Sequence, residues 1–157
     1  MLQRTLPTIR ELLSYRLHQV ANLLSRGAEM RYRREFGVSL WEWRTVALLG
    51  GALEPQSLNE LARAAGMDKG QMSRVVFGLT RRKIIFRETD ANDARGIRLS
   101  LTRSGKKLYG RLISAAAERN SAFLGCLSAQ ERACLEQAMT KLAREARGFI
   151  LAEKQAR

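Results

Sequence analysis

Apolar residues recur along most of this chain at the three- and four-residue spacing of amphipathic helices. Near the N-terminus this spacing predicts one long helix from about residue 8 to residue 34. Pro7 lies near its start, where the missing N–H costs little, and Gly37 is expected to end it. The apolar stripe of this helix consists of Ile9, Leu13, Leu17, Val20 and Leu24.

Capping boxes, in which a serine is followed three residues later by a glutamate, mark the starts of three further helices. These boxes pair Ser39 with Glu42, Ser57 with Glu60, and Ser128 with Glu131. The first box predicts a helix that ends at residues 50–51, where two glycines follow each other, and the last predicts a C-terminal helix. The apolar positions of that C-terminal helix are Leu135, Met139, Leu142, Ala146, Phe149 and Ile150.

The middle of the chain holds two short helices separated by a tight turn. The box at Ser57 predicts a helix over residues 58–65, which Gly66 should end. Asp68 then begins another helix, after a turn of only three residues, and this helix is expected to run to about Arg82. Two short helices joined by a glycine-containing turn are the signature of a helix-turn-helix.

Two short β-strands are predicted after the helix-turn-helix. Residues 84–86 are apolar, and residues 97–101 alternate between apolar and polar as a half-buried strand does. Residues 89–96 between them are rich in turn-forming residues, so we expect a two-stranded β-ribbon, or wing. Helix returns over residues 103–124. The predicted fold class is therefore mainly α with a small two-stranded β-wing.

Charge gives the first indication of a partner. The 157 residues carry a net charge of +13, and residues 63–107 hold 12 basic and four acidic residues, a surplus of +8. A basic segment over a helix-turn-helix is an electrostatic footprint for phosphate. The same charge would also suit a solvated, arginine-rich face or an anionic membrane surface.

Composition excludes several other classes of protein. The 45% apolar content suits one domain with a real core. We expect a cytoplasmic protein, because the N-terminus does not resemble a signal peptide and no apolar run approaches the ~18 residues of a membrane span. One His, two Cys and the absence of P-loop, nucleophile-elbow and HExxH motifs predict no enzyme, metal site or cofactor. Cys126 and Cys134 are expected to be small packing residues.

The second helix of the helix-turn-helix, residues 69–82, offers an outward face that could read a major groove. Met72, Val75, Val76 and Leu79 share the opposite, core-facing side. Arginine can hold guanine in two hydrogen bonds, and small residues allow close approach to the bases. Phe77 could contact thymine methyls or pack beneath a neighbouring element. The candidate DNA contacts on this helix are Lys69, Gly70, Gln71, Ser73, Arg74, Phe77 and Arg81.

The wing adds a second set of candidate DNA contacts. Arg95 precedes Gly96 at the tip, where it could enter a minor groove, with Asp93 holding its orientation. A solvated hairpin tip is the alternative. Arg98 on the second strand is a further candidate. The flanking basic residues predicted to contact phosphates are Arg87, Arg103, Lys106 and Lys107.

These segments together resemble the MarR family of winged-helix regulators. Residues 58–62 (LNELA) are similar to its second helix, and residues 66–69 (GMDK) and 73–76 (SRVV) to its recognition helix. Residues 90–96 (DANDARG) and 99–102 (LSLT), with Gly105, resemble its wing and the start of the next helix. Two positions depart from the family pattern: Lys83 stands where a helix-ending glycine is usual, and Phe77 where a polar residue is common.

The resemblance implies how the whole chain is organised. Residues 1–157 would form one MarR-like domain, with a DNA-binding lobe at about 38–104 and dimerisation helices at about 8–36 and 105–157. Such a homodimer would bind a pseudo-palindromic operator with half-sites ~10 bp apart, on double-stranded DNA. The long apolar stripes of the terminal helices support this independently, because they lie outside the compact helix-turn-helix and need a partner surface.

The resemblance further implies release from DNA by a small-molecule effector, often an aromatic acid or related anion. The candidate effector contacts are Tyr15, His18, Trp41, Trp43 and Arg44, with Arg16 as a possible counter-charge. Surface exposure is an alternative for His18 and a core position for Trp43. The redox-sensing members of the family have their reactive cysteine in the N-terminal helix, where this chain has none.

Two other classes of function fit part of the sequence. A non-specific architectural nucleic-acid-binding protein would share the charge without needing dimer symmetry. A ligand-binding or small catalytic protein could carry the basic surface incidentally. The leading prediction is a sequence-specific transcriptional regulator, most often a repressor in this family.

Overall fold

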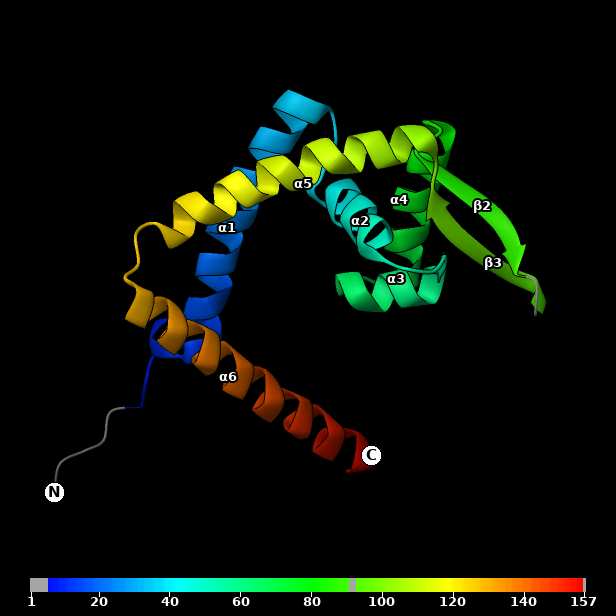
Figure 1. Cartoon of the computed structure of the whole chain (residues 1–157). Helices are drawn as coiled ribbons and strands as arrows, with labels where there is room; N and C mark the ends of the chain where they lie inside the picture. Colours follow the sequence, from blue (N-terminus) through cyan, green and yellow to red (C-terminus); the bar gives the residue numbers. More distant parts are fainter. Residues whose placement is uncertain (1–5, 91–92, 157) are drawn as a thin grey trace, which may run out of the picture. The chain divides into compact units, whose positions relative to one another are not determined.

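The computed structural model describes residues 6–90 and 93–156, and it is mainly helical with a small antiparallel sheet (Figure 1). This confirms the predicted fold class. The elements in chain order are η1 (Ile9–Glu11), α1 (Leu13–Phe36), α2 (Leu40–Gly51), β1 (Gln56–Ser57), α3 (Leu58–Ala65), α4 (Lys69–Arg81), β2 (Ile85–Asp90), β3 (Asp93–Leu101), α5 (Arg103–Leu124) and α6 (Ala129–Gln155).

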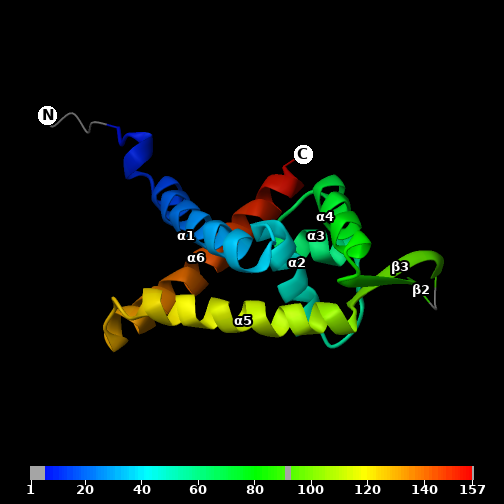
Figure 2. The ribbon, with the colours of Figure 1, turned by 90° about the horizontal axis from the view of Figure 1, so that it is seen from above.

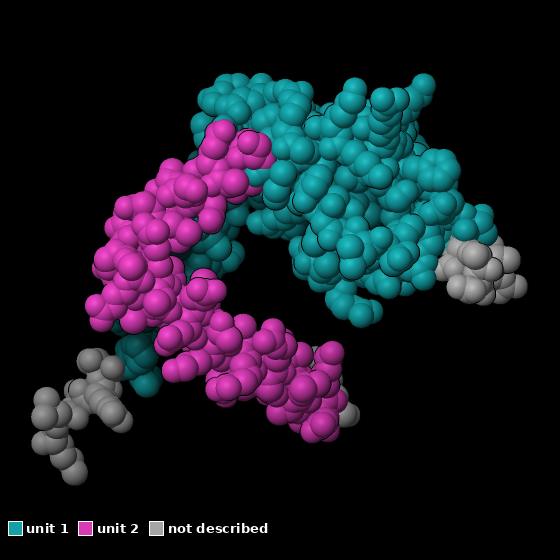
Figure 3. Space-filling view, in the orientation of Figure 1, with its two compact units in different colours: residues 1–113 teal, residues 114–157 magenta. Residues whose placement is uncertain are grey.

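The chain divides into two compact units, Met1–Ile113 and Ser114–Arg157 (Figure 3). The first unit contains α1 to α4, the sheet and the beginning of α5. The second contains the rest of α5 and α6. The division of the chain into one domain with a central DNA-binding lobe remains a prediction.

The helix boundaries follow from local hydrogen bonds at the ends. Ser39, Ser57 and Ser128 each form the predicted capping box, in which the serine hydroxyl accepts from the backbone N–H three residues on. At the other end, Gly37 and Gly66 adopt the left-handed conformation that closes α1 and α3. These stop and start signals explain why most helix boundaries were predictable.

The N-terminal helix differs from its prediction. A single helix over residues 8–34 was expected, but a 3₁₀ turn, η1, comes first and α1 begins only at Leu13 and continues to Phe36. The break occurs at Leu12, whose extended backbone (φ −69°, ψ 134°) cannot continue a helix. Thr8 and Glu11 form a capping box that stabilises the short 3₁₀ turn instead.

The sheet has three strands in the order β1-β3-β2, whereas two were predicted. The additional strand, β1, pairs Gln56 with Leu99 and Ser57 with Arg98. It is only two residues long, so it shows no alternation that a sequence pattern could reveal. The hairpin strands are also longer than expected: β2 continues to Asp90 and β3 begins at Asp93, so both strands enter residues 89–96, which were predicted as a turn.

The core of the first unit lies where α1, α2, α4 and the base of the sheet meet. Met72, Val76 and Leu79 are the fully buried positions of α4, while Val75, also predicted to be core, is half-buried. Viewed from above, α3 and α4 lie side by side and the β2–β3 hairpin extends beyond them (Figure 2). Other buried side chains of this core are Tyr32, Val38, Val46, Leu61, Ile85, Leu99 and Leu112.

The terminal helices expose apolar side chains. Leu17 and Val20 of α1 are about half exposed, and α6 has no buried residue. Cys126 and Cys134 are both exposed free thiols, which corrects the prediction that they are packing residues. Cys126 lies between α5 and α6, and Cys134 lies on α6, which has no buried residue in the single chain. Among the described residues, no helix combines the length and apolar content that crossing a membrane requires.

The junction between α4 and β2 contains the residue that departs from the family pattern. Lys83 has φ +56°, and among the described residues no other non-glycine residue has a positive φ. Its N–H donates to the Thr80 carbonyl and the N–H of Ile84 to the Leu79 carbonyl, both at 2.9 Å, which together form a Schellman motif. The turn geometry is therefore that of a glycine, although the residue is a lysine.

Candidate DNA-binding surface and ligand pocket

The outward face of α4 is held rigidly by its cap and its core. Asp68 Oδ1 accepts a hydrogen bond from the Gln71 N–H at 2.8 Å, which fixes the first turn. The buried Met72 anchors the opposite side. The α4 residues predicted to contact DNA are all exposed: Lys69, Gly70, Gln71, Ser73, Arg74, Phe77 and Arg81.

Phe77 is an apolar side chain in the middle of this polar face. It is 58% exposed, so it does not pack beneath a neighbouring element, which was the alternative the sequence left open. The Arg81 guanidinium carbon lies 5.8 Å from the centre of its ring. Phe77 and Arg81 therefore form an exposed apolar and cationic pair one helical turn apart.

The wing residues have different environments. Arg98 is partly buried, and its Nη1 donates to Glu60 Oε2 at 3.2 Å and to the Pro55 carbonyl at 3.4 Å. This arginine therefore connects β3 to α3 and to the segment before β1, which is a structural task the sequence did not indicate. The side chains of Arg95 and Asp93 lie outside the described residues. Four other basic residues near the sheet are exposed, namely Arg87, Arg103, Lys106 and Lys107.

Glu60, in the first turn of α3, is the carboxylate that pairs with Arg98. Hydrogen bonds from the backbone N–H and then from the hydroxyl of Ser57 lower the pKa of Glu60, and the positive charge of Arg98 lowers it further. The carboxylate thus stays ionised below the usual glutamate range and serves both the cap of α3 and the ion pair with Arg98.

A pocket of about 580 Å³ opens between α1 and α2. Among the predicted effector contacts, Trp41 lines it directly. The Arg44 guanidinium lies over the Trp41 ring, 4.9 Å from its centre, and donates at 3.3 Å to Ser25, another wall residue. The lining residues are Gln19, Asn22, Leu23, Ser25, Arg26, Glu29, Arg33, Ser39, Leu40 and Trp41.

The other predicted effector contacts lie apart from the pocket walls. His18 is exposed, with its Nε2 at 2.9 Å from the Asn22 amide nitrogen, so it adjoins the pocket through Asn22. Trp43 is buried in the core, with its ring centre 5.1 Å from that of Tyr32. Tyr15 is half-buried on α1 and does not line the pocket.

Sequence reasoning missed the polar wall that α1 contributes to this pocket. Asn22, Arg26, Glu29 and Arg33 recur three or four residues apart on one face of α1. That spacing was visible in the sequence, but it is the ordinary pattern of a solvated helix face. Only the packing of α2 against α1 distinguishes this face as the wall of a pocket.

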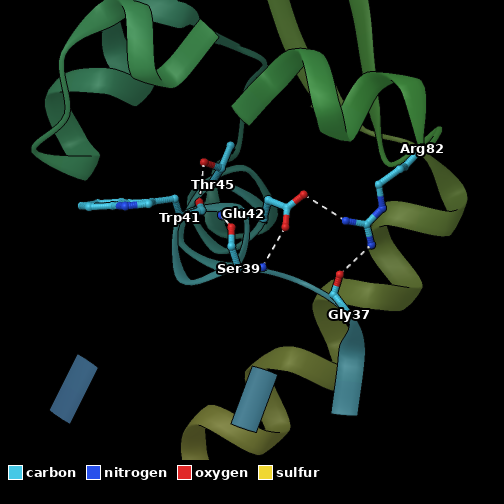
Figure 4. Close-up of polar contacts among 6 residues, drawn as sticks. All are labelled: Gly37, Ser39, Trp41, Glu42, Thr45 and Arg82. Atoms are coloured by element: carbon cyan, nitrogen blue, oxygen red, sulfur yellow. Dashed lines mark hydrogen bonds and ion pairs between the residues drawn. The ribbon is translucent and has the colours of Figure 1, made fainter. Parts of the chain in front are cut away.

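A cluster of polar contacts joins the C-terminal end of α4 to the start of α2 (Figure 4). Arg82, which caps α4, donates from Nη1 to Glu42 Oε1 at 2.9 Å and from Nη2 to the Gly37 carbonyl at 3.2 Å. The other Glu42 oxygen accepts from the Ser39 N–H at 2.7 Å. The Glu42 carboxylate thus caps the N-terminus of α2 and also forms an ion pair with Arg82.

A capped helix with an exposed polar face, preceded by a short helix and followed by a β-hairpin, defines a winged helix-turn-helix protein of the type that binds DNA. Comparison with known proteins identifies which type. The sequence model of the MarR family matches residues 36–96, which is the helix-turn-helix and most of the wing.

Solved structures agree over most of the chain. A MarR/EmrR family transcriptional regulator from Acinetobacter sp. ADP1 is 26% identical, with 90% of this chain and 99% of that chain covered and a TM-score of 0.81. A probable transcriptional regulator from Pseudomonas aeruginosa is also 26% identical, covering 86% and 99%, with a TM-score of 0.73. MepR of Staphylococcus aureus in complex with DNA shares the fold, with 24% identity, coverage of 85% and 98%, and a TM-score of 0.78.

The chain therefore carries the MarR-family sequence pattern over residues 36–96 and shares the fold of MarR-family transcriptional regulators over most of its length. These findings support a DNA-binding transcriptional regulator rather than an enzyme. The family resemblance predicted from its motifs is confirmed.

Proposed function

We propose that this protein binds a specific, pseudo-palindromic operator as a homodimer and represses transcription until a small anionic effector releases it. The observation that carries the DNA-binding part is the exposed face of α4, on which Arg74 and Ser73 lie one turn beyond a capped N-terminus. Arginine at that place can hold guanine O6 and N7 together. Arg95 and Arg98 of the wing stay proposals for minor-groove and phosphate contact.

The homodimer is supported by the exposed apolar stripes of the terminal helices. Leu13, Leu17, Val20 and Leu24 are each more than 40% exposed on one side of α1, and α6 repeats this with Leu135 and Met139. Apolar stripes of this length on a monomer would be an aggregation liability. A second copy of the chain would cover them, and two-fold symmetry would then place two α4 helices on one duplex.

The effector part rests on the pocket between α1 and α2. Its walls hold two arginines, Arg26 and Arg33, against one acidic residue, Glu29, and the Trp41 ring offers an aromatic surface. Arg33 is ion-paired with Glu29. The combination suits a small aromatic anion, whose ring would stack on Trp41 while its charge meets Arg26 and the paired Arg33. Of the contacts predicted from sequence, we propose Trp41, Arg44 and His18 as effector contacts of this pocket, and Tyr15 and Trp43 as residues that support its surroundings.

Selection of binding sites from random duplex DNA tests the central proposal. We expect enrichment of an inverted repeat with half-sites ~10 bp apart. Arg74→Ala should then weaken binding to the selected operator by ~1–3 kcal/mol while leaving random DNA little changed. Lys69→Ala is the matched control, since loss of a phosphate contact should weaken both duplexes alike. Absence of any enriched sequence would favour an architectural protein instead.

A thermal-shift screen with aromatic acids and their CoA thioesters tests the effector proposal. A ligand at 100 times its dissociation constant stabilises the folded protein by ~2.7 kcal/mol, which is readily seen as a rise in melting temperature. Trp41→Ala should abolish the shift given by a hit. A hit that stabilises the protein but does not release the operator would refute the regulatory role of the pocket.

A further inference from the structure

Arg82 is the point where three elements of the first unit meet. It follows the last residue of α4, and its two terminal nitrogens contact different elements: Glu42 in the first turn of α2, and the carbonyl of Gly37 at the end of α1 (Figure 4). A planar guanidinium can make both contacts at once because its N–H groups form a fixed fork. These contacts join residues 40 and 45 positions apart in the chain.

The acceptors of this fork are themselves held in place. Glu42 is only 20% exposed at its side chain, and its second oxygen caps the Ser39 N–H at 2.7 Å. Gly37 adopts the left-handed conformation that ends α1. Both acceptors of Arg82 are therefore held in place. Through these two contacts, Arg82 ties the C-terminal end of α4 to the junction of α1 and α2.

We infer that Arg82 is a positioning residue for sequence recognition, which sets the orientation of α4 relative to α1 and α2. The inference rests on the proposed function, because it requires that α4 reads an operator. It also identifies a route for regulation. Leu40 and Trp41 belong to the same first turn of α2 that holds Glu42, and Ser39 caps that turn. All three residues line the α1–α2 pocket.

A positioning role and a purely electrostatic role for Arg82 predict opposite effects on operator affinity when Glu42 is neutralised. If Arg82 were only a phosphate contact, neutralising its neighbour Glu42 would remove a negative charge near the DNA and strengthen binding to every duplex. If Arg82 is a positioning residue, the same change frees its guanidinium from α2. The recognition helix must then be reoriented on binding, which weakens binding to the operator alone.

Glu42→Gln tests this directly, because glutamine also serves in a capping box and so preserves the start of α2. We expect its operator affinity to fall about three- to fivefold, the worth of a partly exposed ion pair, while affinity for random DNA is unchanged or rises. Arg82→Lys keeps the charge but not the fork, and should show the same loss. The double variant should lose no more than either single variant, since both changes break one contact.

Glu131→Gln is the matched control. Glu131 forms an identical capping box with Ser128 on α6, and the described structure shows it no arginine partner. The Glu131→Gln variant should therefore prefer the operator over random DNA as strongly as the wild-type protein does. A Glu42→Gln variant that binds both duplexes more tightly, or an Arg82→Lys variant that keeps the wild-type preference, would overturn the inference while leaving the proposed function intact. If the wild-type protein prefers no sequence, the proposed function fails, and the inference fails with it.

Discussion

Replacing Lys83 by glycine should stabilise the protein. Lys83 closes the Schellman motif after α4 with φ +56°, a conformation in which the Cβ of an L-residue crowds the following carbonyl oxygen. Its side chain is exposed, and among the described residues it has no hydrogen-bond or ion-pair partner. Removal of the side chain should therefore relieve backbone strain without loss of a stabilising contact.

The expected gain is a difference between two opposing effects. Relief of the left-handed strain is worth ~1–2 kcal/mol, and the greater freedom of glycine in the unfolded chain costs ~0.5–1 kcal/mol. The net stabilisation is about 0.5–1 kcal/mol. For a chain of this size that corresponds to a rise in melting temperature of about 1–4 °C.

Thermal unfolding followed by far-UV circular dichroism, without DNA, measures this effect. Lys83→Ala is the control, because alanine removes the same charge and most of the side chain but keeps the Cβ that causes the strain. We expect Lys83→Ala to melt close to the wild type. The reasoning is wrong if Lys83→Gly melts no higher than Lys83→Ala, since glycine would then relieve no strain at this turn.

Three further predictions concern packing, assembly and pH. In a urea titration, Gly105→Ala should destabilise the protein by ~1–2 kcal/mol, because a Cβ there would clash with the Ile84 carbonyl oxygen. Gly110→Ala on the same helix meets nothing within 4 Å and should stabilise the protein. Val20→Glu on the exposed stripe of α1 should shift the protein toward monomer in analytical ultracentrifugation, and Leu53→Glu, a fully exposed position off the stripe, should not; equal dissociation by both would place the dimer contact elsewhere. Because the Ser57 backbone N–H, its hydroxyl and Arg98 lower the pKa of Glu60, its contribution to stability is present above the ordinary glutamate pKa and is lost as the pH falls through the lowered value. Glu60→Gln should therefore lose less stability on acidification than the wild type, and an unchanged pH profile would contradict this assignment.

The sequence by itself determined most of the helices and the outward face of α4, but not the 3₁₀ turn at Ile9–Glu11. The capping boxes at Ser39, Ser57 and Ser128 join residues only three apart, and the left-handed glycines at 37 and 66 act within one turn. Burial along α4 follows the 3.6-residue period, so the exposed positions of its outward face could also be predicted from the sequence. Such features survive in any tertiary context, because each depends on neighbours along the chain.

Tertiary structure alone decided the third strand, the long-range ion pairs and the pocket. The strand β1 exists only because β3 passes beside Gln56 and Ser57. Arg98 and Glu60 lie 38 residues apart, and Arg82 and Glu42 lie 40 apart, so nothing in their local sequence indicates that they form ion pairs. The pocket likewise arises from the packing of α2 against an otherwise ordinary polar face of α1. These contacts form only after chain closure over tens of residues, and for that reason local hydrophobic and capping patterns do not encode them.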